Sequence, residues 1–399
     1  MDWGFLIKDR DAITVTTDSR KITPGCVFVA LKGEHFDGND YVEQAEKDGA
    51  LYIIKGDHAL EELQDFARAW RRKFDIPLIA VTGTNGKTTT KELTAAVLGT
   101  KYNVLYTDGN YNNSLGVPLT LLRLTKEHDI AIIEMGASHP GDIKELVDIA
   151  EPTHGIITNV GRAHLEGFGS FEGVMKTKGE LYDYLVAHHG TVFQNADNPF
   201  LQEMYLTAKR SNSESGLTAK RSNNEVVYYA GSPMLSGTHL IGDYNAENVQ
   251  AAICIGGHFG VAREAAEAAV RAYVPTNNRS QAMKTEHNDL VVDAYNANPT
   301  SMQAAINAFK GDTFILGAMR ELGTYSHLEH QNIVNMLLER RQNHVFLIGD
   351  EWRETTAPYP VLADVEELAK HLEQQPLTGC RILIKGSRSN QLEKIIPYV

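Results

Sequence analysis

The sequence lacks several features that would assign it to other classes of protein. No apolar run approaches the roughly 20 residues that a membrane-spanning helix requires. The first residues, Met-Asp-Trp-Gly-Phe, carry neither the basic region nor the long apolar core of a signal peptide. The only cysteines, Cys26, Cys254 and Cys380, are far apart and show no metal-ligand spacing. Together these absences predict a cytoplasmic protein with reduced cysteines and no membrane insertion.

An excess of basic residues is also missing. The chain has 38 Lys and Arg against 51 Asp and Glu, which gives a net charge of −13. That balance provides no electrostatic footprint for a nucleic acid or an anionic membrane. A substrate that carries phosphate must therefore be held by local basic residues, against an unfavourable overall field.

What the sequence does contain is an alternation of short apolar runs with helical patterns over 399 residues, enough for two or three domains. We predict an α/β fold with three domains: a small α/β domain at 1–75, a central doubly wound parallel sheet at 76–277, and a Rossmann-like domain at 278–399. The junction at 275–279 is a plausible hinge. The predicted strands are Ala12–Thr17, Cys26–Leu31, Ala50–Ile54, Ile76–Val81, Ile130–Met135, Gly155–Val160, Thr191–Gln194, Leu290–Asp293, Thr313–Leu316, Val345–Ile348 and Arg381–Lys385.

The motif TGTNGKTTT at 82–90 follows the predicted strand Ile76–Val81 and precedes a predicted helix. Glycines let such a loop curl so that its N–H groups point at an anion. A lysine and a threonine then supply an ammonium for phosphate oxygens and a hydroxyl for Mg²⁺. The motif predicts a site for ATP or GTP, formed by Gly83, Thr84, Asn85, Gly86, Lys87, Thr88 and Thr89.

The loop is shorter than a usual P-loop, because only Thr84 and Asn85 separate its two glycines where four residues are common. This spacing argues against an ordinary GTPase or transport ATPase and favours a ligase lineage. A glycine-rich turn without a ligand is the alternative interpretation.

Two further side chains follow predicted strands, where functional residues of parallel sheets gather. Glu134 directly follows the apolar residues 130–133 of the run Ile130–Met135 and is placed to hold Mg²⁺ beside the phosphate loop. His164 follows the next strand in a glycine-rich stretch and is a second candidate ligand. A helix-capping acid and a structural histidine are the alternatives.

The spacing of candidate residues along predicted helices indicates which side chains can face the site together. Lys176 and Lys178 are two residues apart, so at most one of them faces the site. Asn245 and Asn248 share one helical face, where they can cap the helix or contact a base. Arg279 could hold a phosphate with its guanidinium fork.

A short repeat, LTAKRSN, occurs at 206–212 and again at 217–223. It is too short for a solenoid unit. Its Ser, Asn and Lys content predicts a solvated surface loop without a binding role.

Several of these segments together resemble the Mur ligases, the ATP-dependent amino-acid-adding enzymes of peptidoglycan synthesis, and the resemblance covers nearly the whole chain. They are TGTNGKTTT, EMGA, NVGRAHLEGFGS and YNAENVQAA. The segments at 17–38, 110–122, 293–306 and 385–396 are similar to the branch that adds D-alanyl-D-alanine to UDP-N-acetylmuramoyl-tripeptide. YNANP at 295–299 is the most specific of these signals.

The resemblance implies a role for each matching residue. Lys87 would bind the β- and γ-phosphates, while Thr88, Glu134 and His164 would hold Mg²⁺ together with Lys178 as a carbamate. The ATP would also contact Asn245, Asn248, Arg279 and Asp293. The UDP part of the substrate would bind the first domain at Ser19 and Arg20, Asn112 and Asn113 would line the substrate cleft, and Asn296 and Asn298 the dipeptide side.

ATP and Mg²⁺ are therefore the expected cofactors, and a monomer is expected. Two alternatives stay open: a sister Mur or folylpolyglutamate-type ligase, and a nucleotide-binding regulator that has lost ligation. The sequence does not specify the third residue of the acceptor peptide, L-lysine or meso-diaminopimelate, or a general base.

Overall fold

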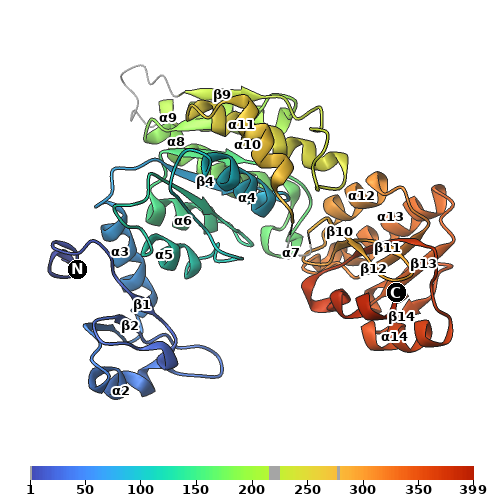
Figure 1. Cartoon of the computed structure of the whole chain (residues 1–399), viewed down its shortest axis with the longest axis horizontal. Helices are drawn as coiled ribbons and strands as arrows, with labels where there is room; N and C mark the ends of the chain where they lie inside the picture. The colour runs from blue at the N-terminus through green and yellow to red at the C-terminus, as the bar shows by residue number, and fades with distance from the viewer. Residues whose placement is uncertain (1, 215–224, 276–278) are drawn as a thin grey trace.

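The computed structural model describes residues 2–214, 225–275 and 279–399. Three α/β regions are present, as predicted. Each contains its own sheet, and the sheets follow one another along the chain (Figure 1). The predicted α/β class with three domains is confirmed, whereas the boundaries at 75 and 277 remain predictions. Within these residues no helix is long and apolar enough to cross a membrane.

The first sheet is small and parallel, in the order β1-β2-β3. The strands lie within the predicted runs, and β2 is buried at every residue because its sequence, VFV, is apolar throughout. Its elements are β1 (Val15–Thr16), β2 (Val27–Val29), β3 (Tyr52–Ile54), α1 (Gly4–Ile7), α2 (Val42–Lys47), α3 (Ala59–Arg71), and the 3-10 helices η1 (Ser19–Lys21) and η2 (Gly38–Tyr41).

Helix α3 connects this sheet to the next one. Its apolar residues recur at a spacing of three or four, as in Leu63, Phe66 and Trp70, and all three are fully buried. The helix packs against α5 (Gly116–Leu121) and α6 (Asp142–Ala150). Trp70 Nε1 donates to the carbonyl of Leu124 at 3.1 Å, which anchors the buried face.

The second sheet has six parallel strands in the order β5-β6-β4-β7-β8-β9. The central strands are fully buried, as their continuous apolar runs predict. The edge strands β5 and β9 are short and were not predicted. The elements are β4 (Leu78–Thr82), β5 (Val104–Tyr106), β6 (Ile130–Glu134), β7 (His154–Ile157), β8 (Thr191–Asn195), β9 (Val226–Tyr229), α4 (Lys87–Leu98), α7 (Leu165–Phe168), α8 (Phe171–Ala187), α9 (Pro199–Glu214), η3 (Asp243–Asn245), α10 (Ala246–His258) and α11 (Arg263–Ala272).

The third sheet has the order β10-β11-β15-β12-β13-β14, and only β10 runs antiparallel to its neighbour. Its elements are β10 (Gln281–Lys284), β11 (Asp289–Asp293), β12 (Thr313–Gly317), β13 (His344–Ile348), β14 (Val361–Leu362), β15 (Arg381–Lys385), α12 (Pro299–Ala308), α13 (Ser326–Glu339), α14 (Val365–Gln374), η4 (Gly323–Tyr325), η5 (Asp350–Glu354), η6 (Arg388–Asn390) and η7 (Leu392–Tyr398).

The second and third sheets meet at α7, which lies between them (Figure 1). Leu165 and Phe168 of α7 are buried in the same apolar cluster as Met319 and Leu322, which follow β12. A helix of the central segment thus contributes side chains to the core of the C-terminal domain.

The loop prediction for the LTAKRSN repeat is wrong for its first copy, because residues 206–212 belong to α9. Leu201, Met204, Tyr205 and Ala208 are buried at helical spacing, and the helix packs on α8. This apolar face outweighs the polar composition of the copy. The second copy at 217–223 lies outside the described residues, as does 276–278 of the predicted hinge.

Candidate active site

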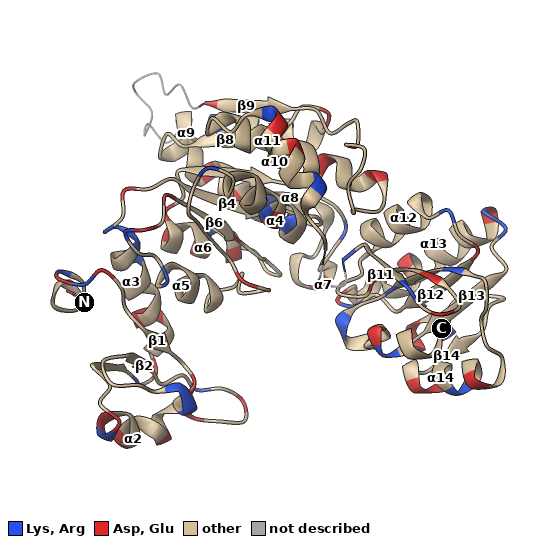
Figure 2. Cartoon of the chain, in the orientation of Figure 1, with Lys and Arg blue, Asp and Glu red and all other residues tan. Residues whose placement is uncertain are grey.

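A cavity of about 630 Å³ lies where the carboxyl ends of the second and third sheets face each other. Among the described residues, Lys and Arg are mixed with Asp and Glu rather than gathered on one element (Figure 2), so any phosphate site must be local. The predicted residues that line the cavity are Thr84, Asn85, Gly86, Lys87, Thr88, Thr89, Asn112, Asn113, Glu134, His164, Asn245, Asn248, Arg279, Asp293 and Asn296.

The phosphate loop runs between β4 and α4 in a conformation that its glycines permit. Gly83 and Gly86 have φ angles of 145° and 80°. A Cβ on Gly83 would lie 1.9 Å from Thr158 Oγ1, and one on Gly86 would lie 2.3 Å from Asn248 Oδ1. The loop is therefore packed closely against β7 and α10, with no room for a side chain at either glycine.

Lys87 begins α4 and turns back over the loop, where its ammonium donates to the carbonyls of Gly83 at 2.8 Å and Thr84 at 3.1 Å. Burial lowers the pKa of Lys87 to about 8; the carboxylate of Glu134 opposes this shift and Arg279 adds to it. A desolvated cation of this kind gains strongly from an anion placed beside it.

Glu134 ends β6 with a buried carboxylate that is only half satisfied. Its Oε1 accepts from Asn112 Nδ2 at 2.8 Å and from Thr88 Oγ1 at 3.2 Å. Its Oε2 is buried and has no hydrogen-bond partner among the described residues. An unpartnered carboxylate oxygen beside a threonine hydroxyl suits a hard cation such as Mg²⁺.

His164 directly precedes α7 and has a left-handed backbone at φ 50°. Its Nδ1 is hydrogen-bonded to a carboxylate oxygen of Glu321, a residue of the C-terminal domain. Burial lowers the pKa of His164, while Glu321 opposes the shift. The contact joins two elements that are 157 positions apart in the chain.

Of the two neighbouring lysines on α8, Lys178 is buried and Lys176 is exposed, which fits two residues that do not share a helix face. Burial lowers the pKa of Lys178 well below its usual value, Lys87 adds to the shift and Asp142 opposes it. Its ammonium lies 5.7 Å from the centre of the Phe168 ring. Lys178 is not among the residues that line the cavity.

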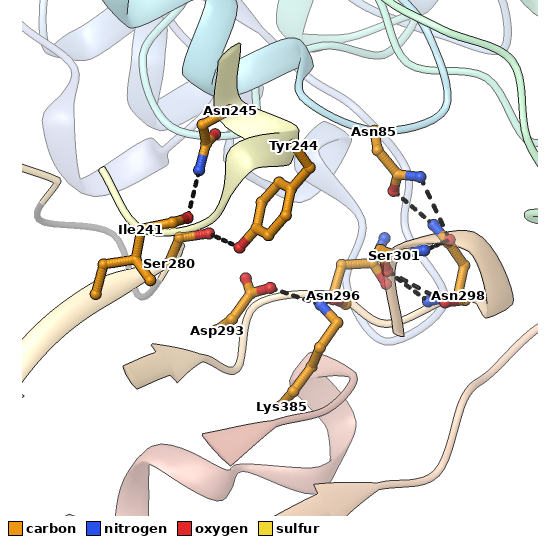
Figure 3. Close-up of polar contacts among 10 residues, drawn as sticks. All are labelled: Asn85, Ile241, Tyr244, Asn245, Ser280, Asp293, Asn296, Asn298, Ser301 and Lys385. Carbon is orange, nitrogen blue, oxygen red and sulfur yellow. Dashed lines mark hydrogen bonds and ion pairs between the residues drawn. The ribbon is translucent and has the colours of Figure 1, made fainter. Parts of the chain in front are cut away.

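Asn245 and Asn248 form a buried chain of hydrogen bonds behind the loop. Asn248 Nδ2 donates to Asn245 Oδ1 at 3.0 Å, and Asn248 Oδ1 accepts from Thr90 Oγ1 at 3.1 Å. Asn245 Nδ2 donates to the carbonyl of Ile241 (Figure 3). Asn245 makes no side-chain cap bond, so the capping alternative is wrong. Asn248 links α10 to α4 through Thr90.

The C-terminal side of the cavity is dominated by satisfied polar groups. Asp293 Oδ2 accepts from Lys385 Nζ at 2.6 Å, and the Lys385 side chain is 1% exposed. Asn298 caps α12 through Ser301 and reaches across to Asn85 of the phosphate loop at 2.8 Å (Figure 3). Asn298 and Gly83 do not themselves line the cavity.

Arg279 lies between the central and C-terminal domains, and its guanidinium is not fully hydrogen-bonded within the described residues. Its guanidinium stacks on the ring of Tyr295, 3.9 Å from the centroid. Its Nε is buried without a hydrogen-bond partner in the part of the chain that the structure describes. An anion in the cavity would provide that partner.

Two predicted residues lie far from this cavity. Ser19 and Arg20 form η1 beside the first sheet, where Arg20 makes a fork of hydrogen bonds to Asp18 at 2.8 and 2.9 Å. These bonds hold the pKa of Asp18 at about 2. Any site at Ser19 and Arg20 is therefore separate from the one around the phosphate loop.

Sequence reasoning missed several residues of the site. Asn159 and Thr158 directly follow β7 and bond the backbone of Asn85, and the rule that selected Glu134 could have found them. Lys385 ends β15 and falls under the same rule. Glu321 lies in a loop after β12 and carries no signal in the sequence. Among the described residues, no three His, Cys, Asp or Glu side chains gather into a metal site.

Models of one family match almost the entire chain. The Mur ligase family, catalytic domain, matches residues 13–97, the Mur ligase middle domain matches 81–256, and the Mur ligase, glutamate ligase domain, matches 278–388. The three matches follow the order of the three sheets.

Curated relatives are similar over nearly their full length. The UDP-N-acetylmuramoyl-tripeptide--D-alanyl-D-alanine ligase of Escherichia coli is 34% identical, covering 96% of this chain and 92% of the relative. The ligase of the same name from Bacillus subtilis is 32% identical with the same coverage.

Solved structures agree with this likeness. The structure of MurF ligase from Thermotoga maritima in complex with ADP superposes with a TM-score of 0.84 at 26% identity, covering 98% of both chains. A structure of MurF from Acinetobacter baumannii gives a TM-score of 0.83 at 27% identity, covering 96% of this chain and 92% of that one.

Proposed function

This chain belongs to the Mur ligase family, and from that membership we propose that it joins D-alanyl-D-alanine to UDP-N-acetylmuramoyl-tripeptide with the energy of ATP. The product is the UDP-N-acetylmuramoyl-pentapeptide of peptidoglycan synthesis. The observation that carries the proposal is the cavity, in which a phosphate loop faces the segment Asp293–Pro299 between β11 and α12. That segment carries the resemblance to this branch of the family.

The phosphate loop would bind ATP. The N–H groups of residues 84–88 at the start of α4 and the Lys87 ammonium would hold the β- and γ-phosphates. Arg279 would supply the second cation, since its Nε is buried without a partner among the described residues. Asn245, Asn248 and Asp293 line the same cavity and would contact the nucleoside part of ATP.

Mg²⁺ would bind at Glu134 and Thr88. The fit is supported by the orphaned Oε2 of Glu134 and by the Thr88 hydroxyl that already contacts the same carboxylate. His164 lines the same cavity and would supply a nitrogen ligand for a second ion. When bound, the ions would neutralise charge on the transferring phosphoryl group.

Lys178 would complete the second ion site as a carbamate. Because burial lowers the pKa of Lys178, its side chain readily adopts the neutral amine form. The nitrogen lone pair attacks the carbon of CO₂, an N–C bond forms and the amine loses a proton, which turns a buried cation into an anion. Labelled ¹³CO₂ should give a carbamate resonance that Lys178→Met removes.

The chemistry explains why ATP is required. A carboxylate is an anion without a leaving group, so an amine cannot displace oxygen from it. In the proposed reaction, the terminal carboxylate of the tripeptide attacks the γ-phosphorus of ATP, which releases ADP and leaves an acyl phosphate. The neutral amine of D-alanyl-D-alanine attacks that carbonyl carbon, and the tetrahedral intermediate expels phosphate. Lys87 and Arg279 would stabilise the negative charge that develops.

The remaining predicted residues would hold the two substrates. Ser19 and Arg20 would contact the UDP part of the nucleotide-tripeptide on a domain of their own, 1–75. Asn112 and Asn113 would line the cleft towards the reacting carboxylate. Asn296 and Asn298 would face the dipeptide; Asn298 would act from α12, since its amide already bonds Asn85. The central domain, 76–277, would then carry ATP, and 278–399 would close the site.

We also propose a cytoplasmic monomer that acts on the nucleotide-linked precursor without nucleic acid. A cytoplasmic location would give the enzyme access to ATP and to UDP-linked substrates. Sedimentation of the purified protein should give a mass near 44.1 kDa.

The test is phosphate release from ATP with purified protein, Mg²⁺ and UDP-N-acetylmuramoyl-tripeptide, with and without D-alanyl-D-alanine. Release that depends on the dipeptide, together with a pentapeptide product by mass, supports the proposal. Parallel assays with the L-lysine and meso-diaminopimelate tripeptides would define the acceptor. Release with a single amino acid in place of the dipeptide would favour a sister ligase. ATP binding without release would favour a regulator.

A further inference from the structure

The contact between His164 and Glu321 stands out because both residues adopt an unusual backbone. Seven non-glycine residues of the described chain have a positive φ, and three of them, His164, Ser280 and Glu321, line the cavity. His164 has φ 50° and Glu321 has φ 59°. Such conformations persist only where surrounding structure imposes them, and they cluster at functional sites. Two of these three residues, His164 and Glu321, contact each other.

The surroundings hold Glu321 at this place. Its carbonyl accepts from the N–H of Glu166 at 3.3 Å, which ties its backbone to α7. Leu322, the next residue, is buried in the apolar cluster that includes Leu165 and Phe168. On the other side, Arg320 is paired with Glu351 and donates to Ser389 at 3.2 Å. The backbone of Glu321 is therefore held by contacts on both sides of it in the chain.

The hydrogen bond with Glu321 involves Nδ1 of the His164 imidazole and leaves Nε2 available for another partner. Nδ1 of His164 meets the Glu321 carboxylate, which can only accept, so Nδ1 carries the proton. Nε2 then has a free lone pair, and none of the described residues hydrogen-bonds to it. A histidine that ligates a metal has this arrangement, with the second nitrogen donating to a carboxylate that fixes the ring.

We propose that Glu321 is a positioning residue that orients His164 for the divalent cation, so that the metal site is complete only when the C-terminal domain is docked. The inference rests on the proposed function, since it takes His164 as a cation ligand. It adds a residue from another domain to that site. Binding of the cation and docking of the domain would then reinforce each other.

The chain offers a matched pair of variants. Glu321→Gly removes the carboxylate at a position whose left-handed backbone glycine adopts freely. Arg341→Gly makes the same change at φ 55° in the same domain, at an exposed residue after α13 that lies outside the cavity lining. Glu321→Gln serves as the conservative variant, because its amide oxygen can still accept from Nδ1–H.

Metal binding is measured with Mn²⁺ in the presence of ADP, by calorimetry and by electron paramagnetic resonance. His164→Gln identifies the site that depends on the histidine. We expect Glu321→Gly to weaken Mn²⁺ at that site by about 10- to 100-fold. Arg341→Gly should match the wild type, and Glu321→Gln should lie between them. Equal affinity in the two glycine variants would overturn the inference.

The tautomer of His164 distinguishes positioning from a purely structural role. In protein labelled with ¹⁵N-histidine at about pH 8, where an ordinary imidazole is neutral, the resonance lost in His164→Gln should report a protonated Nδ1. Glu321→Gly should shift it towards protonated Nε2, whereas Arg341→Gly should leave it unchanged. An unaltered tautomer in Glu321→Gly would overturn the positioning role even if Mn²⁺ bound more weakly.

Failure of the ligase assignment would look different. A wild-type protein without dipeptide-dependent phosphate release, but with an Mn²⁺ site that depends on Glu321, would contradict the proposed substrates and support the inference. A wild type without any Mn²⁺ site that depends on His164 would overturn the inference, even if the protein released phosphate.

Discussion

The two faces of the cavity are built from parallel strands that end in polar residues, yet they differ in how those residues are satisfied. On the central face, Lys87 is desolvated and one oxygen of Glu134 has no partner among the described residues. On the C-terminal face, Lys385 and Asp293 form a buried ion pair. Asn298, which does not itself line the cavity, caps α12 and bonds Asn85 of the phosphate loop.

The difference separates unsatisfied polar groups, which a ligand could bind, from hydrogen-bonded groups that hold the cavity wall in place. Unsatisfied buried groups are costly, and a bound phosphate or cation would relieve that cost. Satisfied groups gain little from a ligand but fix the position of what surrounds it. Substitutions of Lys87 and Glu134 should therefore act mainly on binding and catalysis, whereas substitutions in the Lys385–Asp293 pair should act mainly on stability.

The largest effect should come from the C-terminal face. Lys385→Met leaves the Asp293 carboxylate without its buried partner, and breaking such a pair costs about 3–5 kcal/mol of unfolding free energy. The double variant Asp293→Asn with Lys385→Met removes both charges and should recover most of that loss. Urea denaturation of the single and double variants measures both values; a single variant as stable as the wild type would contradict the comparison.

Lys87→Met on the central face should affect turnover instead. Removing one preorganised charge that contacts a transferring group lowers kcat by about 10²- to 10³-fold. Stability should not fall, because a desolvated ammonium is replaced by an apolar side chain. Phosphate release and thermal melting of the same preparation test both parts, with the exposed Lys176→Met as a control expected to match the wild type.

Glu134→Gln should have opposite effects on metal binding and on stability. Losing the carboxylate should weaken Mg²⁺ by about 10- to 100-fold, the order of magnitude found for perturbed metal sites. The unfolding free energy should rise by about 1 kcal/mol, since the neutral amide costs less to bury than a carboxylate with an orphaned oxygen. Mg²⁺ titration of activity and thermal denaturation without metal measure the two changes. Reduced stability would show that Glu134 is a structural residue like those of the other face.

The smallest effect concerns pH. Because the pKa of Lys87 in the folded protein is lowered to about 8, ADP should bind about fourfold more weakly at pH 8.5 than at pH 7, since a neutral lysine must first take up a proton. Between pH 8 and the usual lysine pKa, Lys87 binds a proton in the unfolded chain but is mostly neutral in the folded protein. The contribution of Lys87 to the free energy of unfolding therefore rises with pH in this range. Calorimetry should detect proton uptake on ADP binding, and Lys87→Met should abolish it.

Much of the fold could be predicted from apolar runs, because buried parallel strands such as β4 and β6 are apolar throughout. The strands that were missed, β5, β9, β10 and β14, are two to four residues long and, apart from β10, offer no more than a short apolar stretch.

The site could be predicted where a rule of topology applied. Lys87 and Glu134 follow strands that meet at one sheet edge, and the sequence reveals both. Glu321 could not be predicted, because neither its left-handed backbone nor its contact with a histidine 157 positions away leaves a local pattern. The repeat at 206–212 was assigned by composition, whereas the apolar spacing of α9 determined its structure.

The position of α7 has a consequence for unfolding. Leu165 and Phe168 of the central segment share one apolar cluster with Met319, Leu322 and the helices of the C-terminal domain. Separating the two domains would expose these side chains to water, so the C-terminal domain cannot melt without loosening the loop that carries His164. We therefore expect the two to unfold as a single cooperative unit with one calorimetric transition, even though each has a sheet of its own.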